Sequence, residues 1–263
     1  MKTEDLIGIL IVGTWLGMLV LESLFPARSY PRVKGWRWLG ALGLVAFMAI
    51  GTVLPLLLPP VVFEHTLLSL ADLPVAVAAP LGFAMVTLVG YVYHRACHRF
   101  DFMWRWFHQL HHSAPRLDIG GSMMFHPFEM AAYSLIQVVI LVPVLGLSAE
   151  AAAFAGLIGA FYSMFQHLNV RTPTGFGYFI QRPEAHGLHH EQGVHAFNYG
   201  DLPLWDMLFG TFRNPSQFTG DVGFGGKQYT RVGSMLIGRD VSQGTGTQAL
   251  QAASAAAHQV VNA

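Results

Sequence analysis

Long apolar runs constrain this chain more than any other feature of its sequence. Residues 6–25 are apolar apart from a few small polar residues and one charge, Glu22. About 20 such residues cross the hydrocarbon core of a bilayer as one α-helix. Runs at residues 36–58 and 74–93 predict two more spans, and shorter runs at 131–147 and 151–166 predict a helical hairpin. We therefore expect an all-α integral membrane helical bundle.

The composition supports a membrane class and excludes several others. Of the 263 residues, 53% are hydrophobic and 11% charged, against roughly 25% charged residues in a typical soluble domain. Lys+Arg and Asp+Glu are balanced at 15 each, so no basic excess exists to bind nucleic acid. A single cysteine, Cys97, excludes an intrachain disulfide and a metal site built from cysteines of this chain. Histidine, by contrast, is abundant at 13 residues.

The first run has a second interpretation, as a cleaved signal peptide. Lys2 is offset by Glu4 and Asp5, the run is long for a signal sequence, and no small-residue cleavage site precedes Pro26. We expect a retained anchor.

Basic residues predict the orientation in the membrane, because short cytoplasmic loops collect Lys and Arg. The loop between the first two runs contains Arg28, Arg32, Lys34 and Arg37, whereas the loop at residues 60–73 contains acidic residues and no Lys or Arg. The first loop is therefore expected inside, and the later histidine-rich segments then fall on the same cytoplasmic side.

Three histidine clusters stand out on that side. They are His94 and His98; His108, His111 and His112; and His186, His189 and His190. Positions i, i+3 and i+4 share one face of a helix, so each cluster is expected to aim its imidazoles in one direction. Ionisable groups near a bilayer are costly and usually functional. Eight imidazoles suffice for two metals, whereas the isolated His65 and His258 are interpreted as packed or solvated side chains.

The spacing excludes two familiar metal chemistries and disfavours two other functions. No cluster contains the glutamate of a His-Glu-x-x-His zinc hydrolase or the Glu-x-x-His pattern of soluble di-iron bundles. A membrane metal-ion carrier is the main alternative, but its ligands are expected near the bilayer midplane. A haem-binding electron carrier needs histidines inside its spans. Here the clusters lie beyond the ends of the apolar runs.

The motifs and their order carry a family resemblance. They read HRACH at 94–98, HQLHHSAP at 108–115, FHP at 125–127, QHLNV at 166–170, HGLHH at 186–190, NYG at 198–200, WD at 205–206 and FGT at 209–211. Over residues 91–215 the chain resembles the fatty acid hydroxylase/sterol desaturase superfamily, whose members are membrane-bound histidine-box di-iron oxygenases.

That resemblance implies a ligand set and a reaction. His167 becomes a ninth ligand, whereas Arg171 stands where one branch of the superfamily has a further histidine. One metal would take His94, His98, His108, His112 and His189, and the other His111, His167, His186 and His190. Two iron ions, with zinc possible in isolated protein, and dioxygen as co-substrate would hydroxylate or desaturate a lipid C–H bond.

The same resemblance implies partners. The chain contains no segment typical of a cytochrome, flavoprotein or ferredoxin, so a separate redox protein is expected as electron donor. Arg95, Arg99, Arg105 and Arg116 offer it a docking patch; alternatively they only set the topology and contact lipid phosphates.

We predict three regions: N-terminal spans and loops (1–73), the catalytic domain (74–215) and a C-terminal cytoplasmic tail (216–263). Residues 173–178 and 210–226 are expected to be irregular, and the tail from Val241 disordered or weakly helical. His126 either orients a ligand or is a loop residue, and His195 is expected near a ligand or at the surface. Trp205, Asp206 and Phe209 are expected to pack the cap against the site.

Overall fold

The computed structural model describes residues 2–242, and these residues form helices and loops without a β-strand. The long helices are α1 (Thr3–Leu24), α2 (Trp36–Val53), α4 (Val75–Arg99), α7 (Pro127–Val139) and α8 (Ala149–Phe165). Short elements join them: η1 (Leu54–Leu57), α3 (Val61–Glu64), α5 (Asp101–Met103), η2 (Trp104–His108), α6 (Gln109–His112), η3 (Ile140–Val144), η4 (Thr174–Tyr178), α9 (Pro183–His189), α10 (Pro203–Leu208), η5 (Gln228–Thr230) and α11 (Val232–Leu236). The predicted all-α class is confirmed.

Four of these helical segments are long and apolar enough to cross a membrane. They are Asp5–Leu24, Trp36–Leu57, Val75–Arg99 and Pro127–Val144. The predicted hairpin is unequal, because α7 continues through the π-helical turn η3, which accommodates Pro143, whereas α8 has 17 residues. Membrane association follows from these spans.

Helix α4 is longer than the apolar run that predicted it. The run ends near Tyr93, but the helix continues to Arg99 and contains His94 and His98. Residues 94–99 are too polar to extend the apolar run, but their residue types are compatible with a helix. A helix of 25 residues is about 37 Å long, which exceeds the roughly 30 Å hydrocarbon core. Its last turns can therefore carry histidines beyond the core.

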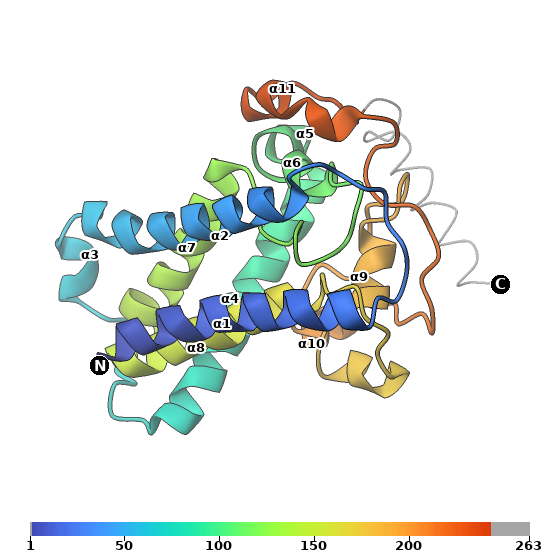
Figure 1. Cartoon of the computed structure of the whole chain (residues 1–263). Helices are drawn as coiled ribbons and strands as arrows, with labels where there is room; N and C mark the ends of the chain where they lie inside the picture. The colour runs from blue at the N-terminus through green and yellow to red at the C-terminus, as the bar shows by residue number, and fades with distance from the viewer. Residues whose placement is uncertain (1, 243–263) are drawn as a thin grey trace.

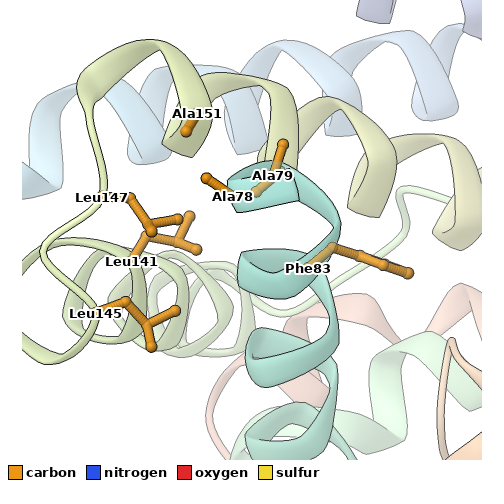
Figure 2. Packing of buried hydrophobic residues seen from close by; sticks show 8 residues of the cluster. Ala78, Ala79, Phe83, Leu141, Leu145, Leu147 and Ala151 are labelled. Carbon is orange, nitrogen blue, oxygen red and sulfur yellow. The ribbon is translucent and has the colours of Figure 1, made fainter. Parts of the chain in front are cut away.

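A compact contact between α4, α7–η3 and α8 anchors the bundle. Ala78, Ala79 and Phe83 of α4 belong to one buried cluster with Leu141 and Leu145 and with Ala151 of α8. Ala78 faces the leucines, whereas the ring of Phe83 projects to the other side of α4 (Figure 2). Helices in lipid associate through close packing, which small residues permit. Alanines on both helices allow α4 and α8 to make the most extensive interhelical contact of the described chain.

Helix α2 holds the loop that follows the second histidine cluster. A Cβ at Gly40 would collide with the carbonyl oxygen of Gly120, and one at Gly43 with that of Met123. The indole of Trp36 donates to Asp118 Oδ1 at 2.7 Å. Helix and loop backbone are thus in direct contact, which fixes the histidine-bearing segment against the bundle.

Most short helices, among them α5, α6, α9 and α10, gather at the end of the bundle opposite the N-terminus, where they form a cap, whereas α3 lies at the N-terminal end (Figure 1). Residues 210–226 are irregular, as predicted, but 173–178 contain the 3₁₀ turn η4 rather than an open loop. Val241 and Ser242 are buried. The remainder of the predicted tail, residues 243–263, lies outside the described residues.

Candidate metal centre

Nine histidines converge in the cap in two groups. In each group, one ligand-type atom per residue lies within 4.8 Å of all the others. The first group contains His94, His98, His108, His112 and His189, and the second contains His111, His167, His186 and His190. These are the two sets that the resemblance implied, brought together from α4, η2, α6, α9 and the end of α8.

In the second and third clusters, the two histidines at i and i+4 lie in the same group, whereas the remaining histidine lies in the other group. His108 and His112 face the first group, while His111 joins the second. Conversely, His186 and His190 face the second group and His189 joins the first. The expectation that each cluster aims in one direction is therefore wrong for the second and third clusters. Adjacent helical positions differ by about 100°, so one segment can serve two neighbouring sites.

The inner nitrogens of each group lie close together. In the first group, His108 Nε2 is 2.8 Å from His94 Nε2 and 2.9 Å from His112 Nε2. In the second, the Nε2 atoms of His186 and His167 are 3.1 Å apart. Two imidazoles bound at right angles to one metal at about 2.1 Å would place their nitrogens about 3 Å apart. The spacing in both groups fits a shared metal.

Backbone carbonyls fix the opposite nitrogens. The Nδ1 atoms of His94, His189 and His167 lie 2.6–2.7 Å from the carbonyl oxygens of Tyr199, Phe197 and Ser163, respectively. A carbonyl only accepts, so each Nδ1 must carry the proton and each Nε2 a lone pair. His189 Nε2 is buried without a hydrogen-bond partner. Lone pairs that converge without donors are the arrangement of a metal site.

Burial keeps these imidazoles neutral. It lowers the pKa of the cap histidines well below the usual value, and repulsion between neighbouring histidines lowers it further; this applies to His108, His111, His112, His186, His189 and His190. Neutral imidazole is the form that binds a metal.

Glu129 is a candidate residue of this centre that the sequence analysis missed. Its carboxylate oxygen Oε1 accepts a hydrogen bond from His108 Nδ1 at 2.5 Å, and its side chain is fully buried. A carboxylate in this position orients a metal-binding imidazole and makes it more basic. The sequence did contain a signal for this residue, since Glu129 is an acidic residue at the start of an apolar helix. A charge there is costly in a membrane and therefore indicates a function.

The two histidines left open by the sequence have different surroundings. His195 is buried, and its Nδ1 lies 2.9 Å from Nδ1 of His112, on the side away from the first group. His126 caps α7, where its Nδ1 accepts from the backbone N–H of Phe128 at 3.1 Å. His195 therefore contacts a histidine of the first group, whereas His126 belongs to the helix terminus.

A strained loop supplies two of the carbonyls. His195, Phe197 and Asn198 all have positive φ angles (42°, 66° and 48°), which non-glycine residues seldom adopt. The side chain of the fully buried Asn198 holds the loop by donating to Ala185 O and accepting from the backbone N–H of Arg213. Such strain persists where surrounding contacts enforce it and is common at functional sites.

The motif around Asp206 braces this loop. The backbone N–H groups of Tyr199 and Gly200 each donate to its carboxylate at 2.8 Å. Trp205 donates to the Thr87 hydroxyl of α4, and Phe209 stacks on Tyr91 at 5.2 Å. These contacts place the cap against α4 at the site.

A cavity of about 390 Å³ leads from the bundle to the histidines. Apolar side chains from α1, α2, α4, α7 and α8 line most of it, and histidines of both groups line one end. Its size lies within the range of small-molecule sites. Its apolar walls suit a hydrocarbon chain.

Comparison with known proteins decides the family. Residues 79–211, about half of the chain and including all nine grouped histidines, match the family model described as fatty acid hydroxylase. The chain belongs to the fatty acid hydroxylase family. The predicted superfamily is thereby confirmed.

One curated member of similar sequence is the ornithine lipid hydroxylase OlsE of Rhizobium tropici. It is 31% identical over 188 residues, which cover 68% of this chain and 56% of that protein. The chain thus spans little more than half the length of this relative. No solved structure matches the chain.

Proposed function

We propose that this chain is a membrane-bound, non-haem di-iron oxidoreductase that uses dioxygen and external electrons to hydroxylate a C–H bond of a lipid. The observation that carries the proposal is the convergence of nine neutral imidazoles at one end of an apolar cavity. Family membership and the name of the relative, a lipid hydroxylase, support lipid hydroxylation over desaturation.

The donor set fits iron, although imidazole also suits zinc and copper. The first and second groups would each hold one ion, and the bound irons would supply the activation of dioxygen that cleavage of an alkyl C–H bond requires. The protein's own contribution is positional. Carbonyls of Tyr199 and Phe197 and the carboxylate of Glu129 hold imidazoles in place, and the apolar walls exclude water and align the chain of the substrate.

Labelled dioxygen tests the reaction. Purified full-length protein, loaded with ferrous iron and given lipid and a reductant under ¹⁸O₂, is expected to yield a lipid with one additional, labelled oxygen by mass spectrometry. Incorporation from labelled water instead of dioxygen would contradict the oxygenase assignment. A lipid lacking two hydrogens and without added oxygen would indicate desaturation. Transport of a metal ion across vesicles with no lipid product would favour the carrier alternative.

We further propose that electrons come from a separate redox protein that docks on the basic side of the cap. Of the four candidate arginines, Arg105 pairs with Asp101 at 2.7 Å and Arg116 with Asp118 at 2.5 Å. Arg95 donates to the hydroxyl of Tyr91. These pairs reduce the free positive charge, so docking depends most on Arg95 and Arg99, which form no ion pair in the described part of the chain.

The cap is proposed to face the cytoplasm, as the basic residues of the first loop indicate. The buried Cys97 permits labelling at single introduced cysteines. Gln217→Cys in the cap and Asp72→Cys in the loop before α4 both replace exposed residues. In intact cells, a membrane-impermeant maleimide is expected to label Asp72→Cys only, and to reach Gln217→Cys after lysis. The opposite pattern would reverse the orientation.

A further inference from the structure

Two polar side chains without adequate partners line the metal end of the cavity. Gln166, the residue before His167, is 5% exposed, and its Oε1 has no hydrogen-bond partner. Its Nε2 donates to Asp201 Oδ1 at 2.8 Å. Both residues line the same cavity as the histidines. A buried amide oxygen without a donor is destabilising, so a ligand that donates a hydrogen bond to it is favoured.

Asp201 lacks a positive partner. Among residues 2–242, Asp201 forms no ion pair. Its side chain accepts a hydrogen bond from Gln166, which is neutral. Burial raises the pKa of this carboxyl to about 6, and the nearby Asp206 adds to the effect. The positive field of Arg95 acts on Asp206. Asp206 also accepts hydrogen bonds from the backbone N–H groups of Tyr199 and Gly200 and from the hydroxyl of Thr211. Asp201 has no such compensation, although a buried charge generally requires it.

Both residues are close in sequence to parts of the candidate metal centre and line the same cavity as its histidines. Gln166 precedes the histidine His167 of the second group, and Asp201 follows Tyr199, whose carbonyl holds His94. Most of the remaining cavity wall is apolar. Among the described residues that line the cavity, Asp201 is the one carboxylate, and Gln166 Oε1 is a buried oxygen without a donor. Both acceptors could therefore take a donor from the substrate.

We propose that Asp201 and Gln166 form a headgroup subsite that binds an ammonium group of the lipid substrate beside the metals. The carboxylate supplies the countercharge, and Gln166 Oε1 accepts one N–H. The acyl chain then extends away from the histidines between the transmembrane helices. This inference rests on the proposed function and narrows it, because it places the oxidised carbon near an amine-bearing headgroup and not near the chain end.

Binding tests this subsite without turnover. The probe is N-palmitoyl-ornithine, compared with the same lipid acetylated on its side-chain amine, titrated into the zinc-loaded full-length protein in detergent. Charge-assisted hydrogen bonds predict that the free amine binds about 10- to 100-fold more tightly. In Asp201→Asn, which retains the shape but not the charge, the two lipids are expected to bind within about threefold of each other. Asp72→Asn, an exposed site outside the cavity, should preserve the preference.

Equal binding of the two lipids by the unmodified protein would overturn the proposal, even if Asp201→Asn failed to fold. A preference that survived in Asp201→Asn would also overturn it, since the pair would then only tie the loop to α8. The outcome is separate from that of the oxygen-labelling experiment. A preference without labelled product would retain the subsite and refute the reaction, whereas labelled product without a preference would do the reverse.

Discussion

Replacing either His111 or His189 with alanine is expected to lower lipid oxidation by more than about 100-fold, because even the outer partners of metal ligands are worth about 10- to 100-fold. His111 belongs to the second group and His189 to the first, so the two variants address different metals. Each is expected to reduce the iron content from about two to about one per chain. Lipid mass spectrometry of expressing cells and metal analysis of purified protein measure both effects.

His65→Ala is the matched control for these variants. His65 is exposed, follows α3 and lies outside both groups, so oxidation and metal content should be unchanged. Unaltered helical circular dichroism would show that the variants remain folded. Retention of two irons and full product formation in His189→Ala would contradict the assignment of the first group as a metal site.

The transmembrane part of the fold was predictable because one physical length governs it. Bilayer thickness and helical rise together require about 20 apolar residues, and the chain displays such runs. The end of α4 was not predictable in the same way, since residues 94–99 are polar and leave the hydropathy pattern while the backbone remains helical. Close backbone contacts, such as Gly40 against Gly120, depend on tertiary packing that a single sequence does not reveal.

The grouped histidines were predictable as clusters, but their orientation within the clusters was not. Spacing identifies the i, i+4 pairs, yet it cannot show that His111 and His189 face the opposite group. The π-helical turn Trp104–His108 also ends at the first histidine of the second cluster and changes the phase of the helix there. Only the family resemblance implied the division of the residues into the two groups that the structure shows.

The hydrogen-bond partners that hold the histidines in place were the least predictable part of the site. Several are backbone carbonyls, whose positions depend on the strained loop at residues 195–198 and not on residue type. Asn198 and Asp206 belong to recognisable motifs, but their hydrogen bonds emerge only from the fold: Asn198 donates to Ala185 O, and Asp206 accepts from the backbone N–H of Tyr199. The loop thus connects two motifs of the sequence to the orientation of His94 and His189.

Glu129→Gln is expected to weaken metal binding at the first group by about 10- to 100-fold and to lower lipid oxidation accordingly. The carboxylate accepts from His108 Nδ1 at 2.5 Å, and a neutral amide of the same size cannot support the same basicity of the ring. Competition with a chelator of known affinity measures the effect independently of activity. The second group has no direct contact with Glu129 among the described hydrogen bonds, so one of the two irons should remain tightly bound.

Glu150→Gln provides the matched control, because Glu150 is exposed in the first turn of α8 and its neutralisation should affect neither metal. If Glu129→Gln bound both irons as tightly as the unmodified protein, Glu129 would act only as a buried hydrogen-bond partner. If both irons were weakened equally, the two groups would be coupled through the cap, since His108 and His111 lie on the same short segment. Weaker binding of only one iron would show that the Glu129 carboxylate acts through His108, the single imidazole that it contacts.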